Sequence, residues 1–270
     1  LLLLLAVPFS GLLERVASTL MAKELANLDK MPVHYRSVIN QDNLDNIEVA
    51  IASIRREIQR MLLLTEEMML PIMDLFKEYD VKQMEKIVKK DLVINEALNG
   101  TRRYVSELSG VSGVKKSNDA HRKELSNLLE FAIAIEAAGD VISKTLSKLA
   151  ANKYHEGVRF SPEGLAELRS MHDKVVANIS LAANVLVSGD VGIARQLLEE
   201  KNEFTLRQRK SRKSHLKRLA KGRVEVLESS DLHLETGLAF KEFNSHIASI
   251  AYPILAREGQ LLDSRLVSEN

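Results

Sequence analysis

Apolar residues recur along this chain at alternating spacings of three and four positions. From residue 44 to 79 this pattern is nearly continuous and predicts a long helix that packs along one stripe. Pro71 lies inside the segment and should kink or split that helix. A second helix with the same spacing follows over residues 80–108, and an acid, Asp91, occupies a position on its apolar stripe.

Four more segments carry the same helical pattern. They cover residues 118–149, 161–186, 191–220 and 232–255, and Ser161 followed by Pro162 is typical of a helix start with serine as the cap. Three helices followed by three helices indicate an internal duplication, and short connections make sequential helices antiparallel neighbours. We therefore predict an all-α fold of two tandem antiparallel three-helix bundles. The halves should span residues 41–157 and 158–258, followed by a tail over 259–270.

The chain opens with a leucine-rich stretch that ends at Glu14 and Arg15. These thirteen residues are fewer than the roughly 20 that span a bilayer. The abrupt change to charge is typical of a helix leaving the membrane. Residues 1–22 are thus predicted to be the end of a truncated transmembrane helix, in preference to an ordinary buried amphipathic helix. Residues 23–40, which include Pro32, should form a linker.

The most apolar helical segment, residues 128–142, contains three acids. Glu136 and Asp140 are four residues apart and share one helix face, whereas Glu130 lies on another side and should reach water. Two carboxylates among aliphatic side chains repel each other and lose hydration. Each therefore needs a cation, a proton or a hydrogen-bond donor.

Composition narrows the possible functions. The chain has 45% hydrophobic and only 4% aromatic residues, which suits helices, and it has no cysteine. Thiolate chemistry is therefore excluded, and a metal would need oxygen or imidazole ligands. No G-x-S-x-G motif or glycine-rich phosphate loop occurs, so we do not expect an enzyme.

The densest charge cluster lies at residues 207–223, with nine basic residues. It forms either a solvated helix face or a surface attracted to anionic lipids on the inner leaflet of a membrane. Nucleic-acid binding is not expected, because no aromatic residue interrupts the cluster and the net charge of the chain is only +1. The histidines lack a metal-ligand spacing, and most of them should be surface or capping residues. The four considered are His172, His215, His233 and His246.

Two segments resemble the PhoU family of phosphate-uptake regulators. Residues 136–140, EAAGD, match the acidic E-x-x-x-D signature of that family, and residues 243–254 read FNSHIASIAYPI. With the six-helix plan, the resemblance covers about residues 40–256. It is closest to the cytoplasmic PhoU-like region that ends bacterial sodium-dependent phosphate cotransporters, where a final membrane helix precedes the domain.

The resemblance implies a carboxylate metal site in the first half, formed by Asp91, Glu136 and Asp140. The cation would be divalent or ferric, such as iron or zinc. In the second half, Lys201 and Lys241 stand at the positions equivalent to Asp91 and Glu136, so a second metal site should be lost. The alternative for the first-half acids is a salt-bridge network in which Lys201 or Lys241 supplies the cation.

The resemblance also implies a function. We expect a regulatory cytoplasmic domain of a sodium-dependent phosphate cotransporter, held at the cell membrane. The alternative is a freestanding PhoU-like adaptor that regulates a phosphate-uptake ABC transporter through protein contacts. Expected partners are the membrane, through the N-terminal helix and the basic helix 207–223, and either other proteins or further copies of the chain.

Overall fold

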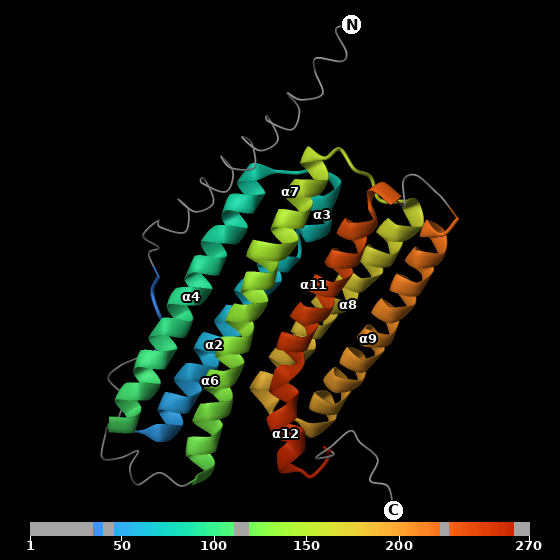
Figure 1. Cartoon of the computed structure of the whole chain (residues 1–270). Coiled ribbons are helices and arrows are strands. Elements are labelled where there is room, and N and C mark those ends of the chain that lie inside the picture. The colour runs from blue at the N-terminus through green and yellow to red at the C-terminus, as the bar shows by residue number, and fades with distance from the viewer. Residues whose placement is uncertain (1–34, 40–45, 111–118, 222–226, 262–270) are drawn as a thin grey trace, which may run out of the picture.

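The computed structural model describes residues 35–39, 46–110, 119–221 and 227–261, and within these ranges every regular element is a helix and no strand occurs. Figure 1 shows long helices running side by side along one direction. The predicted all-α fold of two three-helix halves is confirmed.

The first half contains three long helical rods, the first and third of which are interrupted. The elements are α2 (Ile47–Met69), α3 (Ile72–Lys77), α4 (Val81–Gly110), α6 (Asp119–Asp140), the π-helix η3 (Val141–Leu146) and α7 (Ser147–His155). The break between α2 and α3 falls at Pro71, as predicted, because proline cannot donate the backbone hydrogen bond that would continue the helix. The π-helix, in contrast, interrupts a segment that the sequence predicts as one continuous helix.

The second half repeats this plan. Its elements are α8 (Pro162–Ser188), α9 (Val191–Leu219), α11 (Ser230–Ile247), the short 3₁₀ turn η4 (Ala248–Ile250) and α12 (Ala251–Arg257). The predicted cap at Ser161 is confirmed, since its hydroxyl accepts the Gly164 N–H at 3.1 Å. Gly189 ends α8 in the left-handed conformation, with φ of 62°. Asp190 then caps α9 by accepting the Ile193 N–H.

The two halves pack against each other along their inner helices. Helix α6 contacts α11, and α2 contacts α8, whereas α4 and α9 lie at opposite edges of the molecule (Figure 1). One hydrophobic core extends through both halves. Its largest fully buried side chains include Phe76, Phe204, Phe240 and Phe243. This packing makes the two halves one body.

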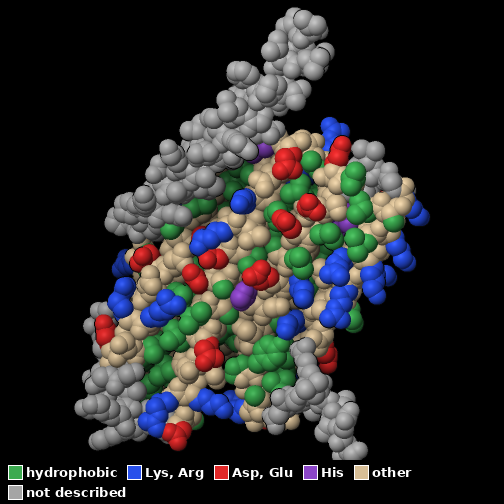
Figure 2. All heavy atoms as spheres, viewed as in Figure 1, with side chains coloured by type: hydrophobic (Ala, Val, Ile, Leu, Met, Phe, Trp, Pro, Cys, Tyr) green, Lys and Arg blue, Asp and Glu red, His purple; other side chains and the backbone are tan. Residues whose placement is uncertain are grey.

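The surface of the bundle is charged and mixed, with acidic and basic side chains spread over the face in Figure 2. Among the described helices, none is both long and apolar enough to cross a membrane. The predicted end of a transmembrane helix, residues 1–22, lies outside the described residues. The same holds for most of the predicted linker and of the tail.

Residues 35–39, the described part of the predicted linker, lie against α2. The Glu57 carboxylate is fully buried and accepts the Val38 N–H at 2.8 Å and the Ser37 hydroxyl at 3.2 Å. Burial raises the pKa of Glu57 above its usual value. The Arg60 guanidinium lies 5.2 Å from the centroid of the Tyr35 ring. This part of the linker is thus in contact with the bundle.

Candidate functional site

Asp91 of α4 is the buried acid of the first half, with 2% of its surface exposed. Its Oδ2 accepts a hydrogen bond from the Ser143 hydroxyl at 3.0 Å, and its Oδ1 is buried without a hydrogen-bond partner in the described residues. Burial raises the pKa of Asp91 to about 6, against the lowering effect of Ser143, and the charges of Asp140 and Glu136 raise it further while Lys144 lowers it. Asp91 is therefore a carboxyl group that titrates near neutral pH.

The close approach of α6 to α4 brings the backbone of Gly139 against Asp91. A Cβ atom added to Gly139 would lie 2.9 Å from Asp91 Oδ1, which is too short for a van der Waals contact. The π-helix η3 begins two residues later and contains Ser143. A π turn changes the phase of the side chains that follow it, and such turns occur frequently at functional sites. Gly139 and η3 together place a small residue and a hydroxyl donor against Asp91.

Lys144 supplies the cation at this site. Its Nζ lies 2.6 Å from Asp140 Oδ1, and the side chains of Lys144 and Asp140 are 59% and 34% exposed. The prediction that Lys201 or Lys241 would pair with these acids is wrong, because the partner comes from the same helical rod, one turn further on. Lys201 instead donates to the hydroxyl of Tyr252 in the second half.

Glu136 and Asp140 are half-buried, not enclosed among aliphatic side chains as the sequence suggested. The rod turns this face toward the edge of the packed region, so that Asp91 alone of the three acids is fully buried. Glu130 is exposed, as predicted.

The metal prediction for Asp91, Glu136 and Asp140 stays a prediction. Across the described ranges, no three histidine or acidic side chains are gathered closely enough to hold a metal ion. The unpaired Asp91 Oδ1 is the kind of oxygen that a hard cation would bind. Such a cation would compete with Lys144 for Asp140.

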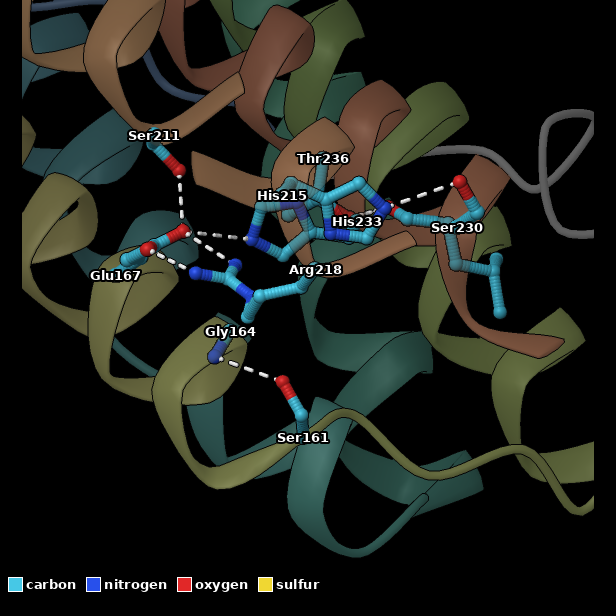
Figure 3. A network of polar contacts seen from close by, with 10 residues as sticks. Ser161, Gly164, Glu167, Ser211, His215, Arg218, Ser230, His233 and Thr236 are labelled. Atoms are coloured by element: carbon cyan, nitrogen blue, oxygen red, sulfur yellow. Dashed lines mark hydrogen bonds and ion pairs between the residues drawn. The ribbon is translucent and has the colours of Figure 1, made fainter. Parts of the chain in front are cut away.

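A second polar cluster joins the three long helices of the second half and is shown in Figure 3. Glu167 of α8 accepts two hydrogen bonds from Arg218 of α9, at 2.8 and 3.0 Å, and one from the Ser211 hydroxyl at 2.7 Å. His233 Nε2 of α11 lies 3.4 Å from Glu167 Oε2, a contact longer than a normal hydrogen bond. Burial opposes ionisation of Glu167, but these donors outweigh it and lower the pKa to about 2.

The histidine rings of this cluster are stacked. The rings of His215 and His233 are nearly parallel, with centroids 4.4 Å apart, and His215 Nε2 lies 3.0 Å from the Ser230 hydroxyl (Figure 3). Burial lowers the pKa of His215, and the nearby His233 and Arg218 lower it further. The neutral form of His215 is therefore favoured.

The prediction that most of these histidines are surface or capping residues is wrong. His172, His215 and His233 are buried, and His246 is half-buried. His172 Nε2 lies 3.0 Å from the Met69 carbonyl oxygen, so this ring connects α8 with the end of α2. Sequence spacing gave no sign of this, because each contact joins one helix to another.

A cavity in the described region lies elsewhere. It holds about 500 Å³ between α6, the end of α8 and α12, and its lining contains neither Asp91 nor Glu167. Much of the lining is apolar, from Leu128, Phe131, Leu186, Ile250 and Ile254. The polar groups with shifted pKa values are therefore separate from this cavity.

No protein-family model matches the chain. Over 258 residues it is 28% identical to the putative inorganic phosphate export protein YjbB of Salmonella typhimurium, an alignment that covers 94% of this chain and 45% of that protein. The protein of the same name from Escherichia coli K12 is 26% identical over 254 residues, covering 93% and 45%. The chain thus spans about half the length of the curated relatives it matches.

Solved structures of PhoU proteins share the architecture. PhoU from Pseudomonas aeruginosa superimposes with a TM-score of 0.70 at 14% identity, over 79% of this chain and 100% of that one. The phosphate transport system regulatory protein PhoU from Streptococcus pneumoniae gives 0.67 at 13% identity, over 81% and 100%. The chain therefore has a PhoU-like fold, as its resemblance to that family predicted.

Proposed function

We propose that this chain is the PhoU-like regulatory part of a protein that moves inorganic phosphate across a membrane, with the bundle on the cytoplasmic side. One combination of findings supports the proposal. The chain aligns over 93–94% of its length with less than half of proteins named as putative phosphate exporters. Its fold corresponds to complete PhoU proteins. A bundle with the architecture of a regulator would thus be joined to a separate transporting part.

The proposed role is binding and regulation, not catalysis. Asp91 offers a way to change state, because its charge is poorly compensated and its pKa lies near neutral pH. A proton or a cation at Asp91 would change the packing between α4 and the η3 turn. We also propose that the transport is coupled to sodium, as the family resemblance implies. The names of the relatives favour export as the direction of transport.

The alternative is a freestanding adaptor that acts on a phosphate-uptake ABC transporter. The fold match to complete PhoU proteins supports this alternative and the first proposal equally, whereas the alignment to longer exporters supports the first proposal. The coding sequence upstream of Leu1 separates the two. Several transmembrane helices there would support the joined transporter, and a nearby start codon would support the adaptor.

Phosphate flux tests the proposal directly. Cells that express the gene encoding this chain are loaded with radioactive phosphate, and its release is compared with that from cells carrying an empty vector. We expect faster release, and a changed rate when the codons for residues 46–261 are removed or Asp91→Asn is introduced. Glu96→Gln, an exposed change on the same helix as Asp91, should leave the rate unaltered. Equal release from vector and gene at verified expression would contradict the proposal.

A further inference from the structure

The outer side of α9, together with Lys221 two residues beyond its end, carries six exposed cations. These are Arg209, Lys210, Arg212, Lys213, Lys217 and Lys221. Within the described residues, none of the six forms an ion pair, whereas Arg207 and Arg218 of the same helix pair with Glu203 and Glu167. The cations that face the bundle are thus neutralised, and those that face away from it are not.

The sequence itself prevents local neutralisation of this surface. No acid occurs between Glu203 and Glu225, so five of the six cations have no acid three or four residues away along the chain. These five are Arg209, Lys210, Arg212, Lys213 and Lys217. Figure 2 shows Lys and Arg side chains gathered along the edge of the molecule where α9 lies. Because the whole chain has a net charge of only +1, this is a local concentration and not a general excess. Like charges that are held together repel each other, so an anionic partner would reduce this repulsion.

Two leucines lie on the same side of the helix. Leu206 is 63% exposed and Leu216 is 45% exposed, and helical periodicity places both among the cations. Exposed leucines surrounded by lysine and arginine are typical of helices that lie in the interface of an anionic bilayer. There, apolar side chains enter the acyl boundary and cations contact the headgroups. The six cations extend over roughly 18 Å of helix, which would place several headgroups within reach.

We propose that this face, residues 206–221, binds the surface of a membrane rich in anionic phospholipid. Helix α9 is an edge helix that contacts α8, α11 and α12 on its inner side, so the face is accessible over its length (Figure 1). Nucleic acid fits the face less well, because no aromatic side chain is available there to stack on bases. The inference does not depend on a role in phosphate transport, since it concerns only the charge and shape of one helix face.

Binding of the full chain to lipid vesicles tests the inference. The triple variant R212Q/K213Q/K217Q removes three cations from the face. The matched control K82Q/K86Q/K89Q removes the same charge from exposed positions on α4. Co-sedimentation is measured with vesicles of phosphatidylcholine alone and with added phosphatidylglycerol. Phosphatidylcholine sets the baseline for any binding that does not depend on lipid charge.

We expect phosphatidylglycerol to increase binding, and we expect the triple variant to lose that increase by on the order of 100-fold while the α4 control keeps it. Raising the salt concentration should weaken this increase in binding, because salt screens exposed charges. The double variant L206S/L216S should reduce the binding that remains at high salt, to which the leucines contribute. Equal loss in the triple variant and the control would overturn the inference. Displacement of the chain from vesicles by a short DNA duplex at equal phosphate concentration would also overturn it, in favour of nucleic acid.

Discussion

Asp91 receives a single side-chain hydrogen bond, from Ser143, although its carboxyl group is almost completely buried. A buried carboxylate normally needs two or more donors or a close cation to remain charged. Lys144 is the cation that could compensate this charge, but it contacts Asp140 instead. The folded protein therefore favours the protonated form of Asp91, and this preference connects its stability to pH.

Asp91→Asn should stabilise the protein above pH 6. The pKa of Asp91 is raised from 3.8 to about 6 on folding, so its contribution to stability is fully present below pH 3.8 and is lost as pH rises through 6. At about 1.4 kcal/mol per pH unit, the loss approaches about 3 kcal/mol at pH 7. In urea unfolding, the free energy of unfolding of the variant should rise relative to that of the wild type as pH increases from 4 to 7.

Glu96→Gln is the matched control for that experiment, because it removes one negative charge from an exposed position on the same helix. It should change the free energy of unfolding little and without this pH dependence. If Asp91→Asn is instead destabilising at pH 7, the charged form of Asp91 has a partner, such as a bound metal, and the argument from burial fails.

Lys144 determines how the metal hypothesis can be tested. Lys144 is exposed and Asp140 is half-buried, so Lys144→Gln should cost less than about 1 kcal/mol without metal, not the larger cost of breaking a buried pair. Removing this competing cation should make the acids a better site. Zinc or iron is therefore expected to raise the thermal midpoint of Lys144→Gln more than that of the wild type.

Lys148→Gln, an exposed change one turn further on, should respond to metal as the wild type does. The opposite result would be that the wild type is purified with stoichiometric metal, that Glu136→Ala abolishes this metal binding, and that Lys144→Gln leaves it unchanged. That outcome would establish Asp91, Glu136 and Asp140 as a metal site of the kind the family resemblance implies.

At the scale of elements, the contact between α4 and α6 depends on Gly139. Gly139→Ala would place a methyl group 2.9 Å from Asp91 Oδ1, and the buried carboxylate has little room to move. We expect a net loss of about 1–3 kcal/mol in the free energy of unfolding, because overpacking outweighs the gain of up to about 1 kcal/mol that alanine gives a helix. Urea unfolding with far-UV circular dichroism measures the change.

Gly100→Ala on α4 provides the comparison. The nearest atom to its added Cβ, on the Tyr35 ring, is 4.0 Å away, so helix propensity should dominate and stabilise the protein by about 0.5–1 kcal/mol. Equal effects at Gly139 and Gly100 would show that the close approach to Asp91 does not constrain the helix pair.

Elements were predictable where the signal is local. The three-four spacing, Pro71 and the Ser161 cap predicted the helices and several of their ends, because each acts within a few residues of its own position. The pair of Asp140 and Lys144 also had a local signal, their spacing of four residues. The contact of Glu167 with Arg218 had none, since 51 residues separate them. The π turn likewise corresponds to no motif in the sequence.

At the scale of the whole molecule, the two halves share a plan but have different polar interiors. The first half buries Asp91 with one hydrogen-bond donor, whereas the second half surrounds Glu167 with Arg218, Ser211 and His233. The pKa values move in opposite directions, to about 6 and about 2. Asp91 of the first half can therefore change charge near neutral pH, whereas Glu167 of the second half stays ionised in its pair with Arg218.

The contact of residues 35–39 with α2 determines where the folded unit begins. A chain of residues 23–270 should match the full chain in helicity and thermal midpoint. A chain of residues 41–270 loses the Val38 and Ser37 donors and the Tyr35 packing, and should be less stable by about 1–2 kcal/mol, because the ordering entropy of the segment offsets much of its contact energy.

The pKa of Glu57 gives that experiment a second and independent measurement. Burial raises this pKa and outweighs the Val38 N–H, which lowers it. Removing the segment should expose the carboxyl group, and because burial is the larger effect the pKa should return toward its usual value. Titration of Glu57 by NMR in the 23–270 and 41–270 chains measures the difference. The same raised pKa and the same thermal midpoint in both chains would mean that the bundle is complete without the segment. A lowered pKa together with a lower midpoint would place the start of the folded unit before residue 41.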